Sequence, residues 1–268
     1  GQLDRFEAEL AESVANLALA YLAKKVLHDA YDGIDPLRPT RPSETDPDRT
    51  TILERLAAIE ERPTNPSSKI RRGMNTLDSF VYAPEFTDRI YLRFVAIHSE
   101  SAFQSHANEE PPITDRLLRT FDGLEHAICQ SLPGARDIEE FVVVPVHPWQ
   151  FHHTLNSRLP DAGVYSVKGF TVPVAPLLNL RTVVPYPDAA TAAHQPHFKL
   201  AIDVQKTSSV RRIPQPEIHD GPRITDALHE IDELEKFDSL GFLGEPSAVC
   251  YQPTDDSGPD PESLAALT

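Results

Sequence analysis

Positively charged side chains gather with short hydroxyl and amide groups at three separate places along this chain. The first is the stretch RPTNPSSKIRRGMN, residues 62–75, which holds four cations. The second is NLRT, residues 179–182, and the third joins Lys199 to the block KTSSVRR, residues 206–212. Arginine binds phosphate or carboxylate through two parallel hydrogen bonds, and lysine supplies a point charge. The three clusters predict a site for a polyanion, such as a nucleotide triphosphate or a tricarboxylate.

The whole chain is acidic, with 41 Asp and Glu against 25 Lys and Arg, and its net charge is −16. Such a surface repels the phosphates of nucleic acids and anionic membranes, so neither is expected as a partner. Clusters of cations are informative against this background. The alternative interpretation is that these cations pair with the chain's own carboxylates, as exposed charges commonly do.

The histidines form a further set that could do chemistry. They occur in two groups, His147, His152 and His153, and His194 and His197. Zinc sites use such residues, and they would suit a metal-dependent hydrolase. No cysteine pair, HExxH motif or GxSxG elbow accompanies them, so a structural hydrogen-bonding role is preferred and no metal ligand is predicted.

Hydrophobic spacing of three and four residues predicts the helices that carry these groups. The expected helices span residues 3–31, 51–61, 114–132, 152–158 and 222–237. Thr51 and Glu54 have the spacing of a capping box at the start of the second helix. Residues 206–212 are expected to form either a helix N-terminus, with Thr207 or Ser208 as the N-cap, or a tight turn. SLAALT, residues 263–268, is expected to begin a further helix.

Apolar runs and alternating patterns predict strands over residues 89–97, 140–146, 174–184 and 197–205. Asn179 and Arg181 lie on one face of the third of these. In the last, the alternation directs the side chains of Phe198, Leu200, Ile202 and Val204 toward the core. The opposite face is expected to carry Lys199, Ala201, Asp203 and Gln205.

Strands and helices do not alternate regularly, and the chain contains neither GxGxxG nor GxxxxGK[ST]. These features exclude the Rossmann and P-loop folds and predict an α+β class, with a helical N-terminal segment and a mixed, mostly antiparallel sheet. The two cysteines, Cys129 and Cys250, are far apart and are expected to be free thiols. No run of 18 apolar residues occurs, so a cytoplasmic protein is expected.

Four segments in order resemble signatures of the IucA/IucC-type synthetases, which are siderophore synthetases independent of nonribosomal peptide synthetases. Residues 62–73 keep every spacing of the family's HPxHPxxKxRxG, and residues 145–150 read PVHPWQ. Residues 179–182 correspond to SxRT, and residues 199–211 to the KL…TSxxR block. Glu245 resembles a later acidic position of the family. The resemblance covers most of the chain from about residue 50 onward.

The resemblance implies an ATP-dependent ligase of siderophore biosynthesis. In this family a carboxylate of citrate or of a related acid attacks the α-phosphate of ATP with the assistance of Mg²⁺. An amine or alcohol then displaces AMP from the acyl-adenylate. The implied nucleotide-binding residues are Ser68, Asn179, Arg181, Thr182, Lys199, Thr207, Ser208 and Arg211. Lys69 and Arg71 are implied at the phosphate and carboxylate end as catalytic residues. The partners implied are these small molecules and, for the full-length protein, a second copy in a homodimer.

The chain departs from the family pattern at three positions. Arg62 and Asn65 stand where the first signature has histidines, and Asn179 stands in place of serine. Neither a guanidinium nor an amide exchanges protons near neutral pH. These departures leave open a second interpretation, a degenerate nucleotide- or anion-binding module without catalysis.

The resemblance also implies a division of the chain. Residues 1–61 correspond to a helical thumb-like segment, and residues 62–268 to a finger-like α+β nucleotide-binding region. The family continues beyond this point with a palm-like C-terminal domain, which is expected to be missing here. The 268 residues by themselves are therefore expected to be inactive.

Overall fold

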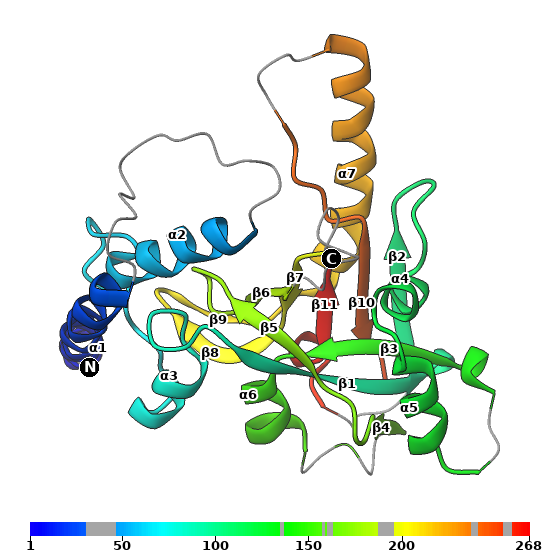
Figure 1. Ribbon diagram of the computed structural model, residues 1–268, viewed down its shortest axis with the longest axis horizontal. Coiled ribbons are helices and arrows are strands. Elements are labelled where there is room, and N and C mark those ends of the chain that lie inside the picture. Colours follow the sequence, from blue (N-terminus) through cyan, green and yellow to red (C-terminus); the bar gives the residue numbers. More distant parts are fainter. Residues whose placement is uncertain are drawn as a thin grey trace. The chain divides into compact units, whose positions relative to one another are not determined.

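The structure is a computed structural model that describes residues 1–30, 47–134, 137–156, 159, 163–186, 196–236, 241–253 and 259–268 (Figure 1). These residues form two compact units. The first unit contains residues 1–90, 173–195 and 203–211, and the second contains residues 91–172, 196–202 and 212–268. Each unit is assembled from separate stretches of chain, so the boundary expected at residues 61/62 falls within the first unit. The end of the first predicted helix at Asp32-Gly33 lies outside the described residues.

The helices of the first unit are α1 (Gln2–Ala30), α2 (Pro47–Glu60) and α3 (Thr76–Tyr82). The expected first helix is confirmed, and α1 packs on α2 through Ala20 and Ile59. The capping box predicted at Thr51 is wrong, because α2 begins four residues earlier at Pro47. Proline suits a first helical turn, where its missing N–H has no partner in any case.

Two hairpins complete the first unit. Strand β5 (Val172–Pro176) pairs antiparallel with β6 (Thr182–Pro185), and β8 (Ile202–Lys206) pairs with β9 (Ser209–Arg211). The continuous strand predicted over residues 174–184 is therefore wrong, because Leu177–Arg181 form a turn. Of the two alternatives for residues 206–212, the tight turn is confirmed and the helix start is wrong. Thr207 has φ +59°, the left-handed conformation that two-residue hairpin turns use.

The strands of the second unit are all paired antiparallel in the described residues. Strand β1 (Ile90–His98) lies between β3 (Phe141–Val146) and β4 (Val164–Ser166), which confirms the first two predicted strands. Strand β10 (Ser247–Tyr251) lies between β2 (Ala102–His106) and β11 (Ala265–Leu267), and β7 (Phe198–Leu200) pairs with β11. The SLAALT segment is thus a buried strand, and the helix predicted there is wrong. The strand predicted over residues 197–205 is broken at Ala201 into β7 and β8.

The helices of the second unit are α4 (Ile113–Thr120), α5 (Leu124–Ser131), α6 (Pro148–Gln150) and α7 (Gln215–Glu235), with a π-helical turn over Phe151–Leu155. Three-residue 3₁₀ turns span Ser99–Ser101, Ile138–Glu140 and Pro261–Ser263. The single helix predicted over residues 114–132 is wrong, because α4 ends at Thr120 and Gly123, with φ +82°, is the N-cap of a separate helix α5. Helix α7 begins seven residues before the predicted start, and Pro222 lies inside it.

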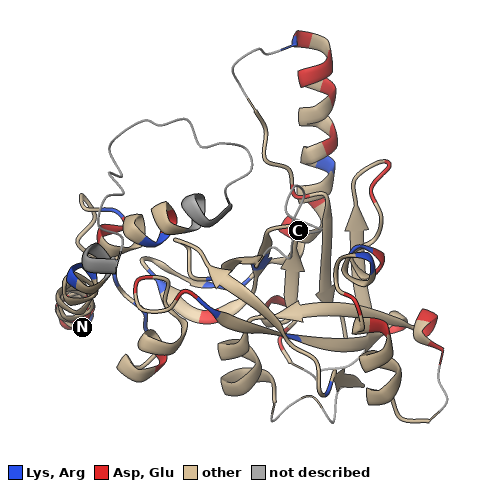
Figure 2. Cartoon of the chain, in the orientation of Figure 1, with Lys and Arg blue, Asp and Glu red and all other residues tan. Residues whose placement is uncertain are grey.

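Burial follows the predicted face of the strands. The side chains of Phe198, Leu200, Ile202 and Val204 are fully buried, so the inward face is confirmed. Cys129 is exposed and Cys250 is buried, and both are free thiols. Acidic residues gather along α7 (Figure 2). Among the helices of the described residues, none combines the length and apolar character that a membrane span requires.

Candidate functional site

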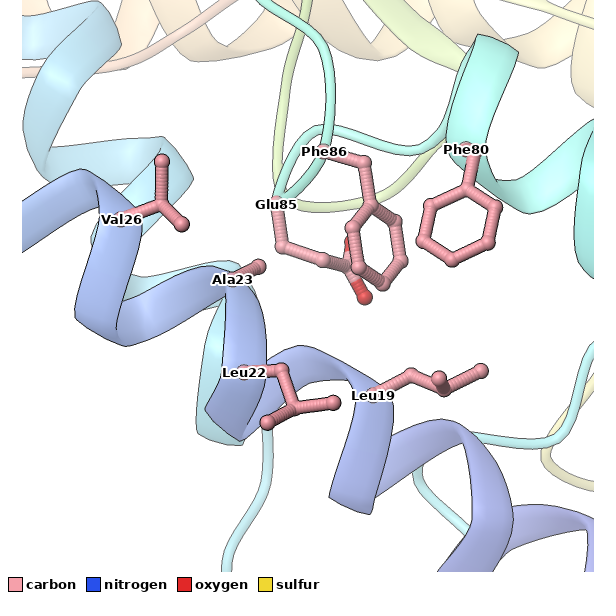
Figure 3. A pocket seen from close by; sticks show the side chains of 7 residues that line it. All are labelled: Leu19, Leu22, Ala23, Val26, Phe80, Glu85 and Phe86. Carbon is pink, nitrogen blue, oxygen red and sulfur yellow. The ribbon is translucent and has the colours of Figure 1, made fainter.

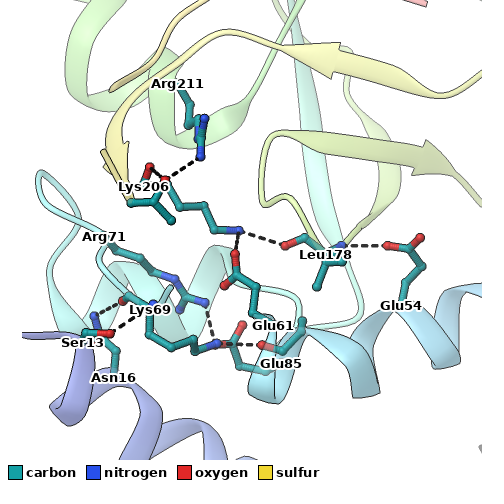
Figure 4. A network of polar contacts seen from close by, with 12 residues as sticks. Ser13, Asn16, Glu54, Glu61, Lys69, Arg71, Glu85, Leu178, Lys206 and Arg211 are labelled. Carbon is teal, nitrogen blue, oxygen red and sulfur yellow. Dashed lines mark hydrogen bonds and ion pairs between the residues drawn. The ribbon is translucent and has the colours of Figure 1, made fainter. Parts of the chain in front are cut away.

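The first predicted cluster forms a buried ion-pair group in the first unit (Figure 4). One oxygen of Glu85 accepts hydrogen bonds from Lys69 Nζ at 2.6 Å and from Arg71 Nη2 at 2.5 Å. The three side chains are at most 2% exposed. Burial raises the pKa of Glu85, but the two cations outweigh burial and hold that pKa at about 2. Burial also lowers the pKa of Lys69, and Arg71 adds to this effect.

The loop that precedes these cations is shaped by Asn65. Its Oδ1 accepts a hydrogen bond from the backbone of Ser67 at 2.9 Å, a local turn typical of asparagine. Gly73 then takes φ +103°, where an added Cβ would lie 3.1 Å from the carbonyl oxygen of Asp203. Glycine is therefore required both for the backbone conformation and for the close approach. In contrast to Asn65, Arg62 is exposed.

Helix α1 holds the backbone of this segment in register. Ser13 Oγ accepts a hydrogen bond from the N–H of Lys69, and Asn16 Nδ2 donates to the Lys69 carbonyl (Figure 4). Glu12 accepts a hydrogen bond from the N–H of Arg71 at 2.8 Å. The orientation of the Lys69 and Arg71 backbone is therefore determined by hydrogen bonds from α1, and not only by the segment itself.

A second buried pair lies at the end of β8. Lys206 Nζ contacts Glu61 Oε1 at 2.7 Å and donates to the carbonyl of Leu178 at 3.0 Å. Burial lowers the pKa of Lys206 to about 8, and the carboxylate of Glu61 acts against this shift. The Leu178 N–H donates in turn to Glu54 Oε2 at 3.0 Å. These contacts connect α2, the β5–β6 turn and β8 within the first unit.

Arg211 differs from the buried cations in its partners. Its Nη2 donates to Thr207 Oγ1 at 3.0 Å and its Nη1 lies 3.4 Å from Ser209 Oγ. Within the described part of the chain, no carboxylate pairs with this half-buried guanidinium. Arg181 Nη1 donates to the Arg211 carbonyl at 3.3 Å, which brings the β5–β6 turn beside the β8–β9 hairpin.

Lys199 belongs to the second unit and has acidic partners there. Its Nζ lies 2.8 Å from Glu245 Oε1 and 3.1 Å from Glu217 Oε2. Glu245 therefore stands beside a predicted nucleotide-binding lysine. The alternative that cations pair with the chain's own carboxylates holds for Lys69, Arg71 and Lys199. Their contact with a ligand stays a prediction.

The first unit holds all the predicted site residues except Lys199. Ser68 is buried, Asn179 and Ser208 are exposed, and Arg181 and Thr182 are half-buried. Sequence reasoning missed the carboxylates of Glu54, Glu61 and Glu85. Glu61 follows α2 and Glu85 follows α3, and no motif distinguishes them from the chain's many surface acids. Glu54 was noted only as part of the predicted capping box, and not for its contact with the β5–β6 turn.

The histidine cluster serves the helix that follows β3. His147 Nδ1 accepts a hydrogen bond from the Trp149 N–H at 3.1 Å and so caps α6. The Trp149 ring stacks on His153, with ring centroids 4.9 Å apart. The described residues hold no group of three His, Cys, Asp or Glu that could bind a metal ion. His194 lies outside the described residues.

The buried imidazole of His147 predicts a loss of stability in acid. Burial lowers its pKa from 6.5 to about 3, so the unfolded chain takes up the proton at a higher pH than the folded chain. The neutral imidazole of His147 therefore contributes to the free energy of unfolding fully above pH 6.5. This contribution, on the order of a few kcal/mol, is lost as pH falls toward 3. His147→Asn keeps a capping oxygen, and we expect it to flatten the pH dependence of the unfolding free energy below about pH 6.

Urea unfolding followed by the fluorescence of Trp149 measures this effect, since Trp149 is the only tryptophan and lies beside the substituted residue. The exposed His126 provides the control substitution to Asn, which is expected to leave the pH dependence unchanged. The prediction would be contradicted if the unfolding free energies of His147→Asn and of the wild type changed equally with pH below about pH 6.

Two cavities of the first unit lie against α1. The larger, about 400 Å³, is lined by apolar side chains, with Glu85 as the charged member (Figure 3). The rings of Phe80 and Phe86 meet edge to face in it, 4.7 Å apart. The smaller, about 290 Å³, has Asn65 and Ser68 in its lining. The apolar lining of the larger cavity does not suit a polyanion, so the polar network of Figure 4 is the better candidate for the site.

Comparison with known proteins adds an independent line of evidence. Residues 50–268 match the IucA / IucC family. D-ornithine--citrate ligase of Staphylococcus aureus is 28% identical over 239 residues, which cover 87% of this chain and 34% of that protein. This chain spans about a third of the length of the curated relatives it matches.

Two solved structures share the fold. The petrobactin biosynthesis protein AsbB of Bacillus anthracis superposes with a TM-score of 0.74 at 23% identity, over 99% of this chain and 41% of that one. The ATP-bound aerobactin synthetase IucA of Klebsiella pneumoniae gives a TM-score of 0.65 at 18% identity, over 98% of this chain and 44% of that one. The matched residues include the 62–75 segment, the β5–β6 turn and the β8–β9 hairpin. The chain belongs to the IucA / IucC family.

Proposed function

We propose that this chain is the ATP-binding portion of a siderophore synthetase. The reaction is the condensation of citrate or a related carboxylic acid with an amine or alcohol through an acyl-adenylate. Relatives named as a citrate ligase and an ATP-bound aerobactin synthetase support the proposal. The observation that carries it is Arg211, whose guanidinium is oriented by hydroxyl groups and faces no carboxylate in the described residues.

The first unit offers the electrostatics that adenylation needs. Attack of a carboxylate on a phosphate joins two anions, so oriented cations lower the barrier by stabilising the charge that develops. The guanidinium of Arg211 is the donor we assign to the nucleotide. Arg181 lies beside it, linked through the Arg211 carbonyl. Lys69 and Arg71 share one carboxylate, so their group retains a net positive charge.

Mg²⁺ is the metal that the family's activity implies. Such ions are commonly held by one or two carboxylates together with the substrate's phosphates. No residue of this chain is assigned to the ion, and no step is derived through it.

A nucleotide- or anion-binding module without catalysis is the second candidate. Arg62 and Asn65 stand where the family signature has histidines, and neither a guanidinium nor an amide exchanges protons near neutral pH. This observation favours binding without turnover. It does not affect the contacts of Arg211.

Pyrophosphate release decides between the two candidates. The protein as the cell makes it is incubated with ATP, Mg²⁺, and a panel of carboxylic acids that includes citrate, with and without polyamines. Release that depends on one of the acids supports the ligase. ATP binding without release supports the module, and a protein that neither binds ATP nor releases pyrophosphate contradicts both.

A further inference from the structure

The backbone of one residue in the β5–β6 turn is held at both of its polar groups (Figure 4). The N–H of Leu178 donates to Glu54 Oε2 of α2 at 3.0 Å. Its carbonyl accepts from Lys206 Nζ of β8 at 3.0 Å. Both contacts involve a side chain that is charged at neutral pH, and such hydrogen bonds are about twice as strong as neutral ones. Leu178 is therefore fixed from two directions.

The second of these contacts also leads back to α2. Lys206 is 4% exposed and Glu61 8% exposed, and they lie 2.7 Å apart. Glu61 follows the last residue of α2, donates its N–H to the carbonyl of Ala57, and has φ +55°. A non-glycine residue in this conformation persists where the surrounding contacts determine it. Helix α2 thus holds Leu178 directly through the hydrogen bond to Glu54. It also holds Leu178 indirectly through Glu61, which pairs with Lys206.

The held turn carries the residues of the NLRT signature. Leu180 has φ +65° and donates its N–H to the Leu177 carbonyl at 2.9 Å, and Arg181 donates its N–H to the Asn179 carbonyl. The turn is therefore tight, and a shift of Leu178 displaces the side chains of Asn179 and Arg181 that follow. A misplacement of about 1 Å can reduce the effect of a positioned group by up to about 100-fold.

We propose that α2 is a positioning element for the nucleotide-binding turn, with Glu54 and Glu61 as its positioning residues. In this proposal neither carboxylate has to contact the nucleotide. Glu54 orients the turn through the Leu178 N–H, and Glu61 orients it through the ammonium group of Lys206. The effect on nucleotide binding rests on the proposed function. The hydrogen bonds that hold the Leu178 backbone, however, can be measured without any nucleotide.

The first measurement is amide hydrogen exchange in the protein as the cell makes it. Glu54→Ala removes the acceptor of the Leu178 N–H, and we expect exchange of a peptide covering residues 177–182 to accelerate at least about tenfold. Glu54→Gln keeps a carbonyl oxygen at that position and is expected to restore most of the protection. Glu60→Gln is the matched control, because the Glu60 carboxylate contacts Tyr21 and Lys24 of α1 instead.

The second measurement is titration with ATP. Glu54→Ala and Glu61→Gln are each expected to weaken ATP binding about tenfold or more, whereas Glu60→Gln leaves it unchanged. Leu56→Ala tests for a general loss of stability. Leu56 packs on the Ala20–Ile59 contact of α1 and α2 and leaves both carboxylates in place, so it is expected to lower the melting temperature without changing ATP affinity.

The outcomes separate the two proposals. Unchanged exchange in Glu54→Ala shows that α2 does not hold the turn and overturns the inference. Accelerated exchange with unchanged ATP affinity also overturns the inference, since the contacts of α2 with the turn then have no effect on nucleotide binding. If the wild-type protein does not bind ATP, the proposed function fails, and so does the role of the turn in nucleotide binding. Hydrogen exchange still shows in that case whether α2 holds the turn. An equal loss of ATP affinity in Leu56→Ala likewise counts against positioning, because lost stability alone would then explain the effect.

Discussion

Glu85→Gln is expected to lower the free energy of unfolding of the first unit by about 3–5 kcal/mol. The glutamine keeps the shape and one acceptor oxygen, but it removes the negative charge that Lys69 and Arg71 share. All three side chains are buried, so water cannot replace the lost carboxylate. Breaking a buried ion pair from one side is costly because it leaves uncompensated charge in a medium of low polarity.

The pH dependence has a definite sign. Burial raises the pKa of Glu85, but the two cations outweigh burial and hold that pKa at about 2, below the ordinary value of 4.5. The stability that the Glu85 carboxylate contributes is therefore complete above pH 4.5 and is lost as pH falls toward 2. Urea unfolding at pH 7 and pH 3, followed by far-ultraviolet circular dichroism, measures both effects. The difference between Glu85→Gln and the wild type is expected to shrink at the lower pH.

The double variant Lys69→Met/Glu85→Gln provides the control for Glu85→Gln. Removing one of the two stranded cations is expected to recover part of the lost stability, which a simple packing defect would not allow. Glu60→Gln, on the exposed part of α2, is expected to change stability by less than about 1 kcal/mol. A double variant that is less stable than Glu85→Gln would contradict the ion-pair explanation.

Arg211→Ala is expected to weaken ATP binding by about 1.5–3 kcal/mol, or roughly 10- to 150-fold, which is the worth of a charge-assisted hydrogen bond. The expectation follows from the partners of the guanidinium. Thr207 and Ser209 orient it through hydroxyls, so its positive charge is not neutralised by a carboxylate within the described residues. Isothermal titration with ATP and Mg²⁺ measures the effect.

The adjacent Arg212 offers a matched control. Its Nη1 lies 2.5 Å from Asp260 Oδ2, so its charge is already compensated in the second unit. Arg212→Ala is therefore expected to change ATP affinity by less than about threefold. Equal losses in Arg211→Ala and Arg212→Ala would indicate a general effect of surface charge, and an unchanged titration for Arg211→Ala would remove Arg211 from the site.

The sequence predicted elements well where a single periodicity dominates. The α1 helix and strands β1 and β3 follow from apolar spacing that is repeated over many residues. The inward face from Phe198 to Val204 follows for the same reason, even though the chain breaks at Ala201. The alternation continues across the break because it depends on which side chains are buried, and not on whether the strand is continuous.

The turn at residues 177–181 was missed because its residues carry no local signal, whereas the tight turn after β8 was one of two alternatives that the sequence left open. Leu180 and Thr207 adopt positive φ, a conformation usually occupied by glycine, asparagine or aspartate. A leucine and a β-branched threonine in this conformation are strained and are stabilised by contacts made elsewhere. The hairpin that carries the NLRT segment could therefore not be predicted from local propensity. For the TSSVR segment, local propensity could not decide between a helix start and a tight turn.

The sequence by itself determined the family and the set of cations that could bind an anion, since both depend on residue types and spacings along the chain. Only the tertiary structure decided which of those cations are neutralised. Lys69 and Arg71 meet Glu85, and Lys199 meets Glu245, whereas Arg211 meets hydroxyls. The reason is physical: the interaction of two charges depends on their distance and on the burial around them, and both are set by folding rather than by separation in sequence.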